Sequence, residues 1–344
     1  MGKSKKIALA LQGGGSHGAF TWGVLGRFLE EEDIEIAAIA GTSAGAINAA
    51  VMAYGLQIGG RREAKEKLEE LWEKIIQMGS FWPLKPTWWD QLTSFGSMLT
   101  SPIYWFSTIY KSIVSPYYWN PFNFNPLRTI LQQVIDFEKL KAGQGPDLFI
   151  CATNVKRCCP CIFYKNDISV EVLLASACVP TFFQAVEIQG EAYWDGGFMG
   201  NPPLFPILRK TDIKDILLVK INPIRITKVP KTMPEIEDRM NEISFNSSLI
   251  WELNWIYFVN TLVKKKGLPK STFREIFLHA ISADEELADL DYSSKLNIEP
   301  GFIYSLKSLG WKYANTWLKE NKVHIGNKST FNLADSLWLI EDFH

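Results

Sequence analysis

The chain has 344 residues, of which 47% are hydrophobic and 21% are charged, and its formal net charge is −1. This composition is typical of a globular protein with a large core, and it excludes an intrinsically disordered chain. The near-zero net charge argues against nucleic acid as the main partner, because binding to phosphates needs a strong basic field.

Hydropathy indicates neither a membrane span nor a cleaved leader. No apolar run reaches the roughly 18 residues that a transmembrane helix needs. The apolar run from Ile7 to Leu11 is too short for the core of a signal peptide. We therefore expect a protein that is cytoplasmic or lies peripherally at a membrane surface, and export by a route without a cleaved signal stays open.

The first predicted unit is a buried strand from Ile7 to Leu11, a glycine-rich loop from Gln12 to Gly18, and a helix from Ala19 to about Glu31. The glycine spacing fits the dinucleotide-binding fingerprint, but no acidic residue ends the next strand to hold a ribose. The favoured alternative is an oxyanion hole, because consecutive glycines expose backbone N–H groups and allow close approach of a ligand. It assigns N–H donors to Gly13, Gly14 and Gly15.

The next unit is an apolar run from Ile34 to Ala40, the sequence Gly41-Thr42-Ser43-Ala44-Gly45, and a helix-forming run that Gly55 is expected to stop. A strand, a Gly-x-Ser-x-Gly turn and a helix make a nucleophile elbow, in which the residue after the serine supplies a second oxyanion donor. The helix N-terminus beneath the hydroxyl favours developing negative charge. The pattern predicts Ser43 as nucleophile and Ala44 as donor; the alternative is a tight turn that happens to hold a serine.

Two segments without a catalytic motif follow. Residues 61–78 predict a charged amphipathic helix with a scaffold role. Residues 81–124 are rich in tryptophan, tyrosine and phenylalanine, carry few charges, and are broken into short pieces by prolines. Because Trp and Tyr favour boundaries between apolar and wet surroundings, we interpret this segment as a cap or lid, with an aromatic-rich core insertion as the alternative.

A predicted helix from Leu127 to Lys139 leads to two strands, Leu148 to Thr153 and Cys161 to Tyr164, which would close a hairpin around clustered cysteines. The pair Cys158-x-x-Cys161 could be half of a zinc site, but no second pair or suitably spaced histidine follows it. We therefore expect reduced thiols in a hairpin, and no metal or other cofactor.

The last motif, Asp195-Gly196-Gly197, ends a strand-like run that starts at Ile188. Asp-Gly is also an ordinary turn dipeptide, but a serine nucleophile needs a neighbour that takes its proton. None of the four histidines carries a motif that marks it as a base; His17 lies in the glycine loop and His279 follows a predicted strand. A carboxylate directly against Ser43 is the economical choice, so we predict Asp195 as the base.

Together and in this order, these motifs resemble those of the patatin-like phospholipases. The matches are Gly13 to Gly18, Gly41 to Gly45 and Asp195 to Gly197, and Ala175 to Pro180 is similar to the family's Ala-Ser-x-x-Pro segment. The resemblance implies a Ser–Asp dyad without a triad histidine, supported by Gly18, Gly41, Gly45, Gly196 and Gly197. It also implies a three-layer α/β/α fold with a central, mainly parallel sheet, which the alternating strands and helices of residues 7–54 support independently.

The resemblance sets the remaining expectations. One catalytic domain spans residues 1–344, with residues 81–124 as the cap and residues 232–344 as a mainly helical extension packed on the core. The expected activity is acyl hydrolysis of a phospholipid or lysophospholipid during transient contact with a membrane surface, with an unidentified activator left open. An acyltransferase that uses the same acyl-enzyme and a catalytically silent lipid-binding protein are the alternatives. His17 stands where the family often has Arg or Lys, and a neutral imidazole would add less positive potential.

Overall fold

The computed structural model describes residues 4–79, 114–226, 228–266, 274–288, 290 and 292–331. The strands in these ranges are β1 Lys5–Leu11, β2 Ile34–Thr42, β3 Asp147–Asn154, β4 Cys159–Tyr164, β5 Val186–Ile188, β6 Glu191–Asp195, β7 Asp215–Val219 and β8 Phe277–Ile281. They form one sheet in the order β5-β6-β3-β2-β1-β7-β8, with β4 paired to β3. The four pairs that run from β3 through β2, β1 and β7 to β8 are parallel, and the pairs that involve β4, β5 and β6 are antiparallel.

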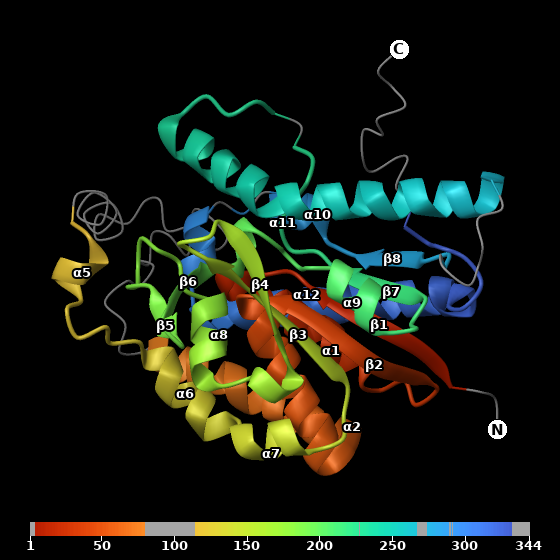
Figure 1. Ribbon diagram of the computed structural model, residues 1–344, viewed down its shortest axis with the longest axis horizontal. Coiled ribbons are helices and arrows are strands. Elements are labelled where there is room, and N and C mark those ends of the chain that lie inside the picture. The colour runs from red at the N-terminus through yellow and green to blue at the C-terminus, as the bar shows by residue number, and fades with distance from the viewer. Residues whose placement is uncertain are drawn as a thin grey trace.

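Helices cover both faces of this sheet (Figure 1). The longer ones are α1 Gly18–Phe28, α2 Ala44–Gly79, α6 Pro126–Val134, α8 Val170–Ser176, α10 Met233–Lys266 and α12 Pro300–Asn321. The shorter ones are α5 Pro116–Trp119, α7 Phe137–Ala142, α9 Phe205–Lys210 and α11 Asp284–Ala288, with 3₁₀ turns η1 Gly15–His17, η2 Lys165–Asp167, η3 Gly196–Phe198, η4 Tyr292–Leu296 and η5 Lys322–His324.

The alternation of side chains along β1 separates the two faces of the sheet. Ile7, Leu9 and Leu11 enter a large core with α1, α2 and α12, whereas Ala8 and Ala10 enter a second core with α9 and α10. Successive side chains of a strand point to opposite faces, so β1 contributes to both cores. The structure therefore confirms the three-layer α/β/α fold with a central, mainly parallel sheet.

Two predicted helix boundaries were wrong. Gly55 does not stop the helix that follows the serine; it lies inside α2, against the backbone of Ala64, and the helical path breaks instead at Gly59 and Gly60, which have non-helical backbone angles. The single helix expected from Leu127 is two helices, α6 and α7. The chain turns between them because the Asp136 side chain accepts the Lys139 N–H and caps a new helix.

The predicted cap and the C-terminal extension are described only in part. Most of the 81–124 segment, residues 81–113, lies outside the described residues, and the described remainder carries α5. Of the 232–344 extension, residues 267–273, 289, 291 and 332–344 also lie outside them. The described part of the extension contributes β8 to the sheet as well as helices. Among the described residues, no helix combines the length and the apolar character needed to cross a bilayer.

Candidate active site

Ser43 occupies a sharp turn between β2 and α2. Its φ is +53°, a left-handed value that is uncommon for a residue other than glycine. The turn demands small neighbours: a Cβ on Gly41 would lie 2.7 Å from the Gly45 carbonyl oxygen, and one on Gly45 would lie 2.2 Å from the Leu11 carbonyl oxygen. The strand, the turn and the helix predicted from the sequence are all present, and they place the Ser43 side chain at the N-terminus of α2.

The pairing of β3 explains why Asp195 arrives beside this turn. Strand β4 occupies one edge of β3 over Phe149 to Asn154, so β2 and β6 must share the other edge. Strand β2 pairs as far as Thr42 with Cys151, and β6 approaches from the opposite direction until Asp195 pairs with Ala152. The C-terminal ends of β2 and β6 therefore meet end to end along β3, with Ser43 and Asp195 at the junction.

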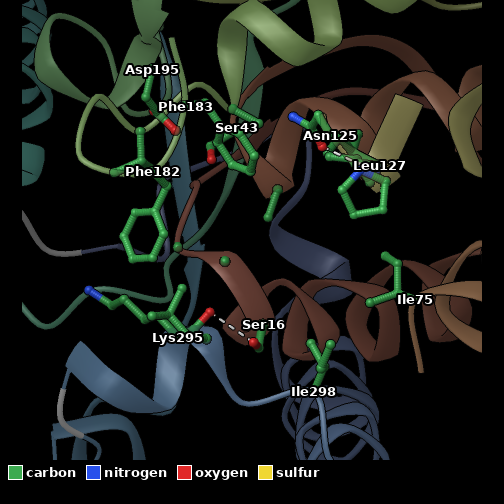
Figure 2. Close-up of a pocket in the computed structure, with 18 of the residues that line it drawn as sticks. Ser16, Ser43, Ile75, Asn125, Leu127, Phe182, Phe183, Asp195, Lys295 and Ile298 are labelled. Atoms are coloured by element: carbon green, nitrogen blue, oxygen red, sulfur yellow. Dashed lines mark hydrogen bonds between the residues drawn. The ribbon is translucent and has the colours of Figure 1, made fainter. Parts of the chain in front are cut away.

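Asp195 is fully buried and faces the Ser43 hydroxyl (Figure 2). Burial raises the pKa of Asp195 to about 7, against the opposing effects of the Gly197 N–H and the Ser43 hydroxyl. One carboxylate oxygen accepts the Gly197 N–H at 2.7 Å, while Oδ2 has no partner of ordinary hydrogen-bond geometry among the described residues. Ser43 is thus close enough to influence the carboxyl, and Oδ2 remains available as a proton acceptor.

The glycine loop approaches the serine closely from the other side. A Cβ on Gly13 would lie 2.6 Å from the Ser43 Cβ. Among the described residues, no group accepts a hydrogen bond from the N–H of Gly14, Gly15 or Ala44. The Gly13 N–H, however, donates to the Asn201 Oδ1 at 2.6 Å. Gly13 therefore cannot offer this N–H to a substrate, and the predicted set of donors narrows to the other three residues.

Buried amides hold the glycine loop in place. The Asn222 side chain donates to the Gly13 carbonyl at 2.7 Å, and Gln12 Nε2 donates to the Asn246 Oδ1 at 3.0 Å. Gln12 Oε1 in turn accepts the N–H groups of Ile221 and Asn222. These hydrogen bonds hold the loop in position before any ligand binds, while the buried Oδ1 of Asn222 has no hydrogen-bond partner among the described residues.

Ser176 is a second serine at the turn, and no role was predicted for it. Its hydroxyl accepts the Ser43 N–H at 2.9 Å and donates to the Cys151 carbonyl at 2.6 Å. Ser176 therefore bridges the turn at Ser43 to β3. The only sequence signal for it was the Ala-Ser-x-x-Pro segment that begins at Ala175.

The electrostatics of the loop follow from burial. Burial, with the positive charge of Lys295 nearby, lowers the pKa of His17 to about 3, so the imidazole is neutral, and its Nε2 lies 2.7 Å from the Ser294 hydroxyl. Lys295 lies at the opposite side of the cavity from Asp195, where its carbonyl accepts the Ser16 hydroxyl (Figure 2). The basic side chain at this site is therefore Lys295 rather than a member of the glycine loop, and burial lowers the pKa of Lys295 against the opposing charges of Asp238 and Glu242.

Ser43, Asp195, Gly14, Gly15 and Ala44 all line one cavity of about 270 Å³. Among the described residues that line it, most of the remaining wall is apolar and Lys295 is the one cation. The apolar part includes residues from α2, from the start of α6 and from the loop before β5: Leu71, Trp72, Ile75, Met78, Leu127, Phe182 and Phe183. An apolar cavity with a few convergent polar groups at one place is typical of a binding site for a largely apolar ligand.

Other candidates from the sequence lie apart from this cavity. The predicted hairpin of β3 and β4 is present, and Cys158, Cys159 and Cys161 are free thiols in or beside it. Within the described ranges, no cluster of three or more histidine, cysteine or acidic residues could hold a metal ion. His279 is buried between Asp215 and Thr330, at 3.1 and 2.9 Å, which fixes it as part of the scaffold.

Comparison with known proteins yields one family match and several distant structural likenesses. The sequence profile of the patatin-like phospholipases matches residues 9–208. No protein with a curated description matches the chain significantly. Among solved structures, VipD from Legionella pneumophila is similar with 14% identity and a TM-score of 0.44, over 92% of this chain and 67% of that one.

The type III effector protein ExoU is similar with 15% identity and a TM-score of 0.35, over 93% of this chain and 54% of that one. A structure of the ExoU–SpcU complex from the type III secretion system of Pseudomonas aeruginosa gives 18% identity and a TM-score of 0.31, over 72% and 50% of the two chains. The chain thus spans about half to two thirds of the length of these solved chains.

The assignment of the chain to a family rests on the profile match. The matched range covers more than half of the 344 residues and contains the glycine loop, the serine turn and Asp195 with its two glycines. The chain belongs to the patatin-like phospholipase family.

Proposed function

We propose that this protein is a lipid acyl hydrolase of the phospholipase A or lysophospholipase type, which cleaves carboxylic esters through Ser43 and Asp195. The observation that carries the proposal is the burial of the Asp195 carboxyl against the Ser43 hydroxyl, at the polar end of an apolar cavity. A base whose pKa lies near neutrality is well suited to proton transfer, because it is ionised at working pH and still basic enough to accept a proton.

In the first half of the reaction, the Asp195 carboxylate accepts the hydroxyl proton as Ser43 Oγ attacks the ester carbonyl carbon. The carbonyl oxygen becomes an oxyanion, which the N–H groups of Gly14, Gly15 and Ala44 stabilise. Removing one such donor typically costs about 3 to 4 kcal/mol of transition-state stabilisation. The proton on Asp195 passes to the departing alcohol, which leaves the acyl group on Ser43.

In the second half, Asp195 accepts a proton from water, whose oxygen attacks the acyl carbonyl. The bond to Ser43 Oγ breaks, the serine regains a proton from Asp195, and the fatty acid leaves. The apolar side chains of Leu71, Trp72 and Ile75 provide the surroundings that an acyl chain requires.

The position of Lys295 in the same cavity favours a substrate with an anionic head group. An ammonium group attracts phosphate, and Lys295 supplies one where the neutral His17 does not; burial lowers the pKa of Lys295, and the charges of Asp238 and Glu242 oppose that effect. We therefore propose a phosphate-bearing lipid ester as the substrate, in preference to a neutral acylglycerol.

Labelling with a fluorophosphonate tests the nucleophile. We expect a single adduct on the peptide that contains Ser43, lost in Ser43→Ala and retained in Ser16→Ala, a matched control because Ser16 lines the same cavity. An adduct that survives Ser43→Ala, or one that moves with Ser16, would refute the assignment. Product analysis with a lysolipid acceptor present separates hydrolysis from acyl transfer, since only the transferase forms a diacyl product.

A further inference from the structure

The outer face of α10 exposes large apolar side chains. This face comprises Met233, Met240, Ile243, Trp251, Trp255 and Phe258, all of which are exposed. Trp251 and Trp255 are 64% and 63% accessible and Phe258 is 51% accessible, and the spacing 251, 255, 258 places these three on one side of a helix. Exposed helix positions of a globular protein normally carry polar residues, and an exposed apolar face of this kind marks an interaction site.

The central part of α10 also contains very few charged residues. Between Ile243 and Val263, Glu252 is the only charged residue. Glu252 points inward, where its carboxylate accepts the N–H groups of Leu204 and Phe205 at 2.7 Å. The inner face is also apolar and packs Leu249 and Leu253 into the core beneath the sheet. The helix is therefore anchored to the body by its inner face, and the outer aromatic residues are not required for that packing.

The same helix forms part of the cavity wall. Asn241 and Phe245 of α10 line the cavity that holds Ser43 and Asp195. Figure 1 shows that α10 changes direction along its length and lies at the edge of the molecule, with the sheet on its inner side. Whatever covers the outer face of α10 would therefore contact a helix that also forms part of the cavity wall.

Cations stand immediately before this helix. Arg225, Lys228 and Lys231 are all exposed, and the equally exposed Val229 lies between the two lysines. The nearby Glu235 caps the helix by accepting the N–H groups of Lys231 and Thr232, and both Glu235 and Glu237 are exposed. Basic and apolar groups that alternate beside an exposed aromatic face fit a surface that is anionic at its boundary and apolar below it.

We propose that the outer face of α10, with the preceding basic residues Arg225, Lys228 and Lys231, docks the protein on the surface of an anionic lipid bilayer. Tryptophan favours the boundary between head groups and acyl chains, and the three cations attract anionic head groups. Docking in this way brings the α10 wall of the cavity to the bilayer. The choice of lipid over a second copy of the chain rests on the proposed function, since the cavity behind this helix is proposed to take a lipid ester.

A second exposed aromatic group borders the cavity from another element. Tyr118, Phe122 and Phe124 are strongly exposed, and Asn125 and Leu127, which follow them directly, line the cavity. Two of the elements that form the cavity wall therefore continue outward into exposed aromatic residues. This arrangement matches a cavity that opens toward an apolar medium.

Flotation on lipid vesicles tests the docking face without any turnover. The experiment uses the Ser43→Ala protein with vesicles of phosphatidylcholine alone and of phosphatidylcholine mixed with phosphatidylglycerol. We expect binding to the mixed vesicles, and a loss on the order of tenfold or more when Trp251, Trp255 and Phe258 are all changed to Ser. Trp311→Ser, on α12 and 42% accessible, is the matched control and should bind as before.

One further variant tests the electrostatic contribution to vesicle binding, and light scattering tests whether the face binds a second copy of the chain instead. Lys228→Gln with Lys231→Gln should weaken binding to mixed vesicles and leave the weak binding to phosphatidylcholine unchanged. Equal flotation of the aromatic triple variant and its parent would overturn the inference. So would light scattering that shows a dimer in the parent and a monomer in the triple variant while vesicle binding persists.

Hydrolysis of a water-soluble short-chain ester separates this inference from the proposed function. With Ser43 intact, the aromatic triple variant should retain that hydrolysis, because its substitutions lie outside the cavity. Vesicle binding without any ester hydrolysis would leave the docking face standing and refute the proposed function. Ester hydrolysis combined with vesicle binding that is unchanged in the triple variant would refute the docking face and leave the proposed function standing.

Discussion

Replacing Asp195 by Asn should abolish activity and, at the same time, stabilise the protein at alkaline pH. The folded protein holds a buried carboxyl whose pKa is raised from 3.8 to about 7. The amide is neutral at every pH and can still accept the Gly197 N–H that the carboxylate oxygen accepts at 2.7 Å. The variant therefore removes the cost of a buried charge and keeps the hydrogen bond that positions the side chain.

The sign and size of this effect follow from linkage. Because the pKa of Asp195 is raised on folding, its favourable contribution is complete below pH 3.8 and is lost progressively up to about pH 7. A difference of about three pH units, at about 1.4 kcal/mol each, gives an upper bound of roughly 4 kcal/mol. The free energy of unfolding of Asp195→Asn relative to the parent should therefore rise between pH 4 and pH 7 and then level off.

Urea unfolding at a series of pH values measures this difference directly. Other titrating groups, including Glu252, are common to both proteins and cancel in the comparison. Ser305→Ala, which changes no ionisable group, is the control, and its difference from the parent should stay constant with pH. A difference for Asp195→Asn that is also independent of pH would refute the buried-carboxyl account, whatever the activity of the variant.

Four further outcomes are expected. The value of kcat/KM for a soluble ester should rise with pH to a half-maximum near pH 7, because Asp195 must be ionised to accept the Ser43 proton; a flat profile from pH 5 to 8 would contradict this. Ser176→Ala should lower the free energy of unfolding by about 1 to 3 kcal/mol and lower kcat, since it leaves the Ser43 N–H and the Cys151 carbonyl without their partner; Ser305→Ala, which loses only a contact within its own helix, should do neither. Ile75→Trp should reduce turnover of long-chain esters far more than that of short-chain esters, because it fills the apolar part of the cavity, and an equal loss for both would argue against an acyl site there. Lys295→Gln should raise KM for phospholipids while leaving KM for a neutral ester unchanged; an equal change in both would indicate a purely structural role.

The sequence was sufficient for features that depend on local patterns. Glycines on both sides of Ser43, between an apolar strand and a run of helix formers, predict the elbow because only small residues fit where strand and helix touch. The alternation of strands and helices at the start of the chain predicted the layered fold in the same way. The break in α2 was missed because Gly55 and the pair Gly59 and Gly60 are equivalent as sequence signals, and only packing against Ala64 distinguishes them.

Long-range pairing accounts for what the sequence could not predict. Gly13 and Asn201 are 188 positions apart, and nothing local to either shows that the amide takes up the glycine N–H. The bridge that Ser176 makes to Ser43 spans 133 positions and is equally invisible. The exposure of Trp251 and Trp255 could not be known before the inner face of α10 was placed, since both faces of this helix are apolar.

A structure of the protein with a phosphonate bound covalently to Ser43 tests the central claim most directly. The account predicts that the phosphonyl oxygen lies about 2.7 to 3.1 Å from N–H groups drawn from Gly14, Gly15 and Ala44, with the Asp195 carboxyl beside the Ser43 oxygen. A phosphonyl oxygen turned away from these donors, or another side chain in the place of Asp195, would contradict it.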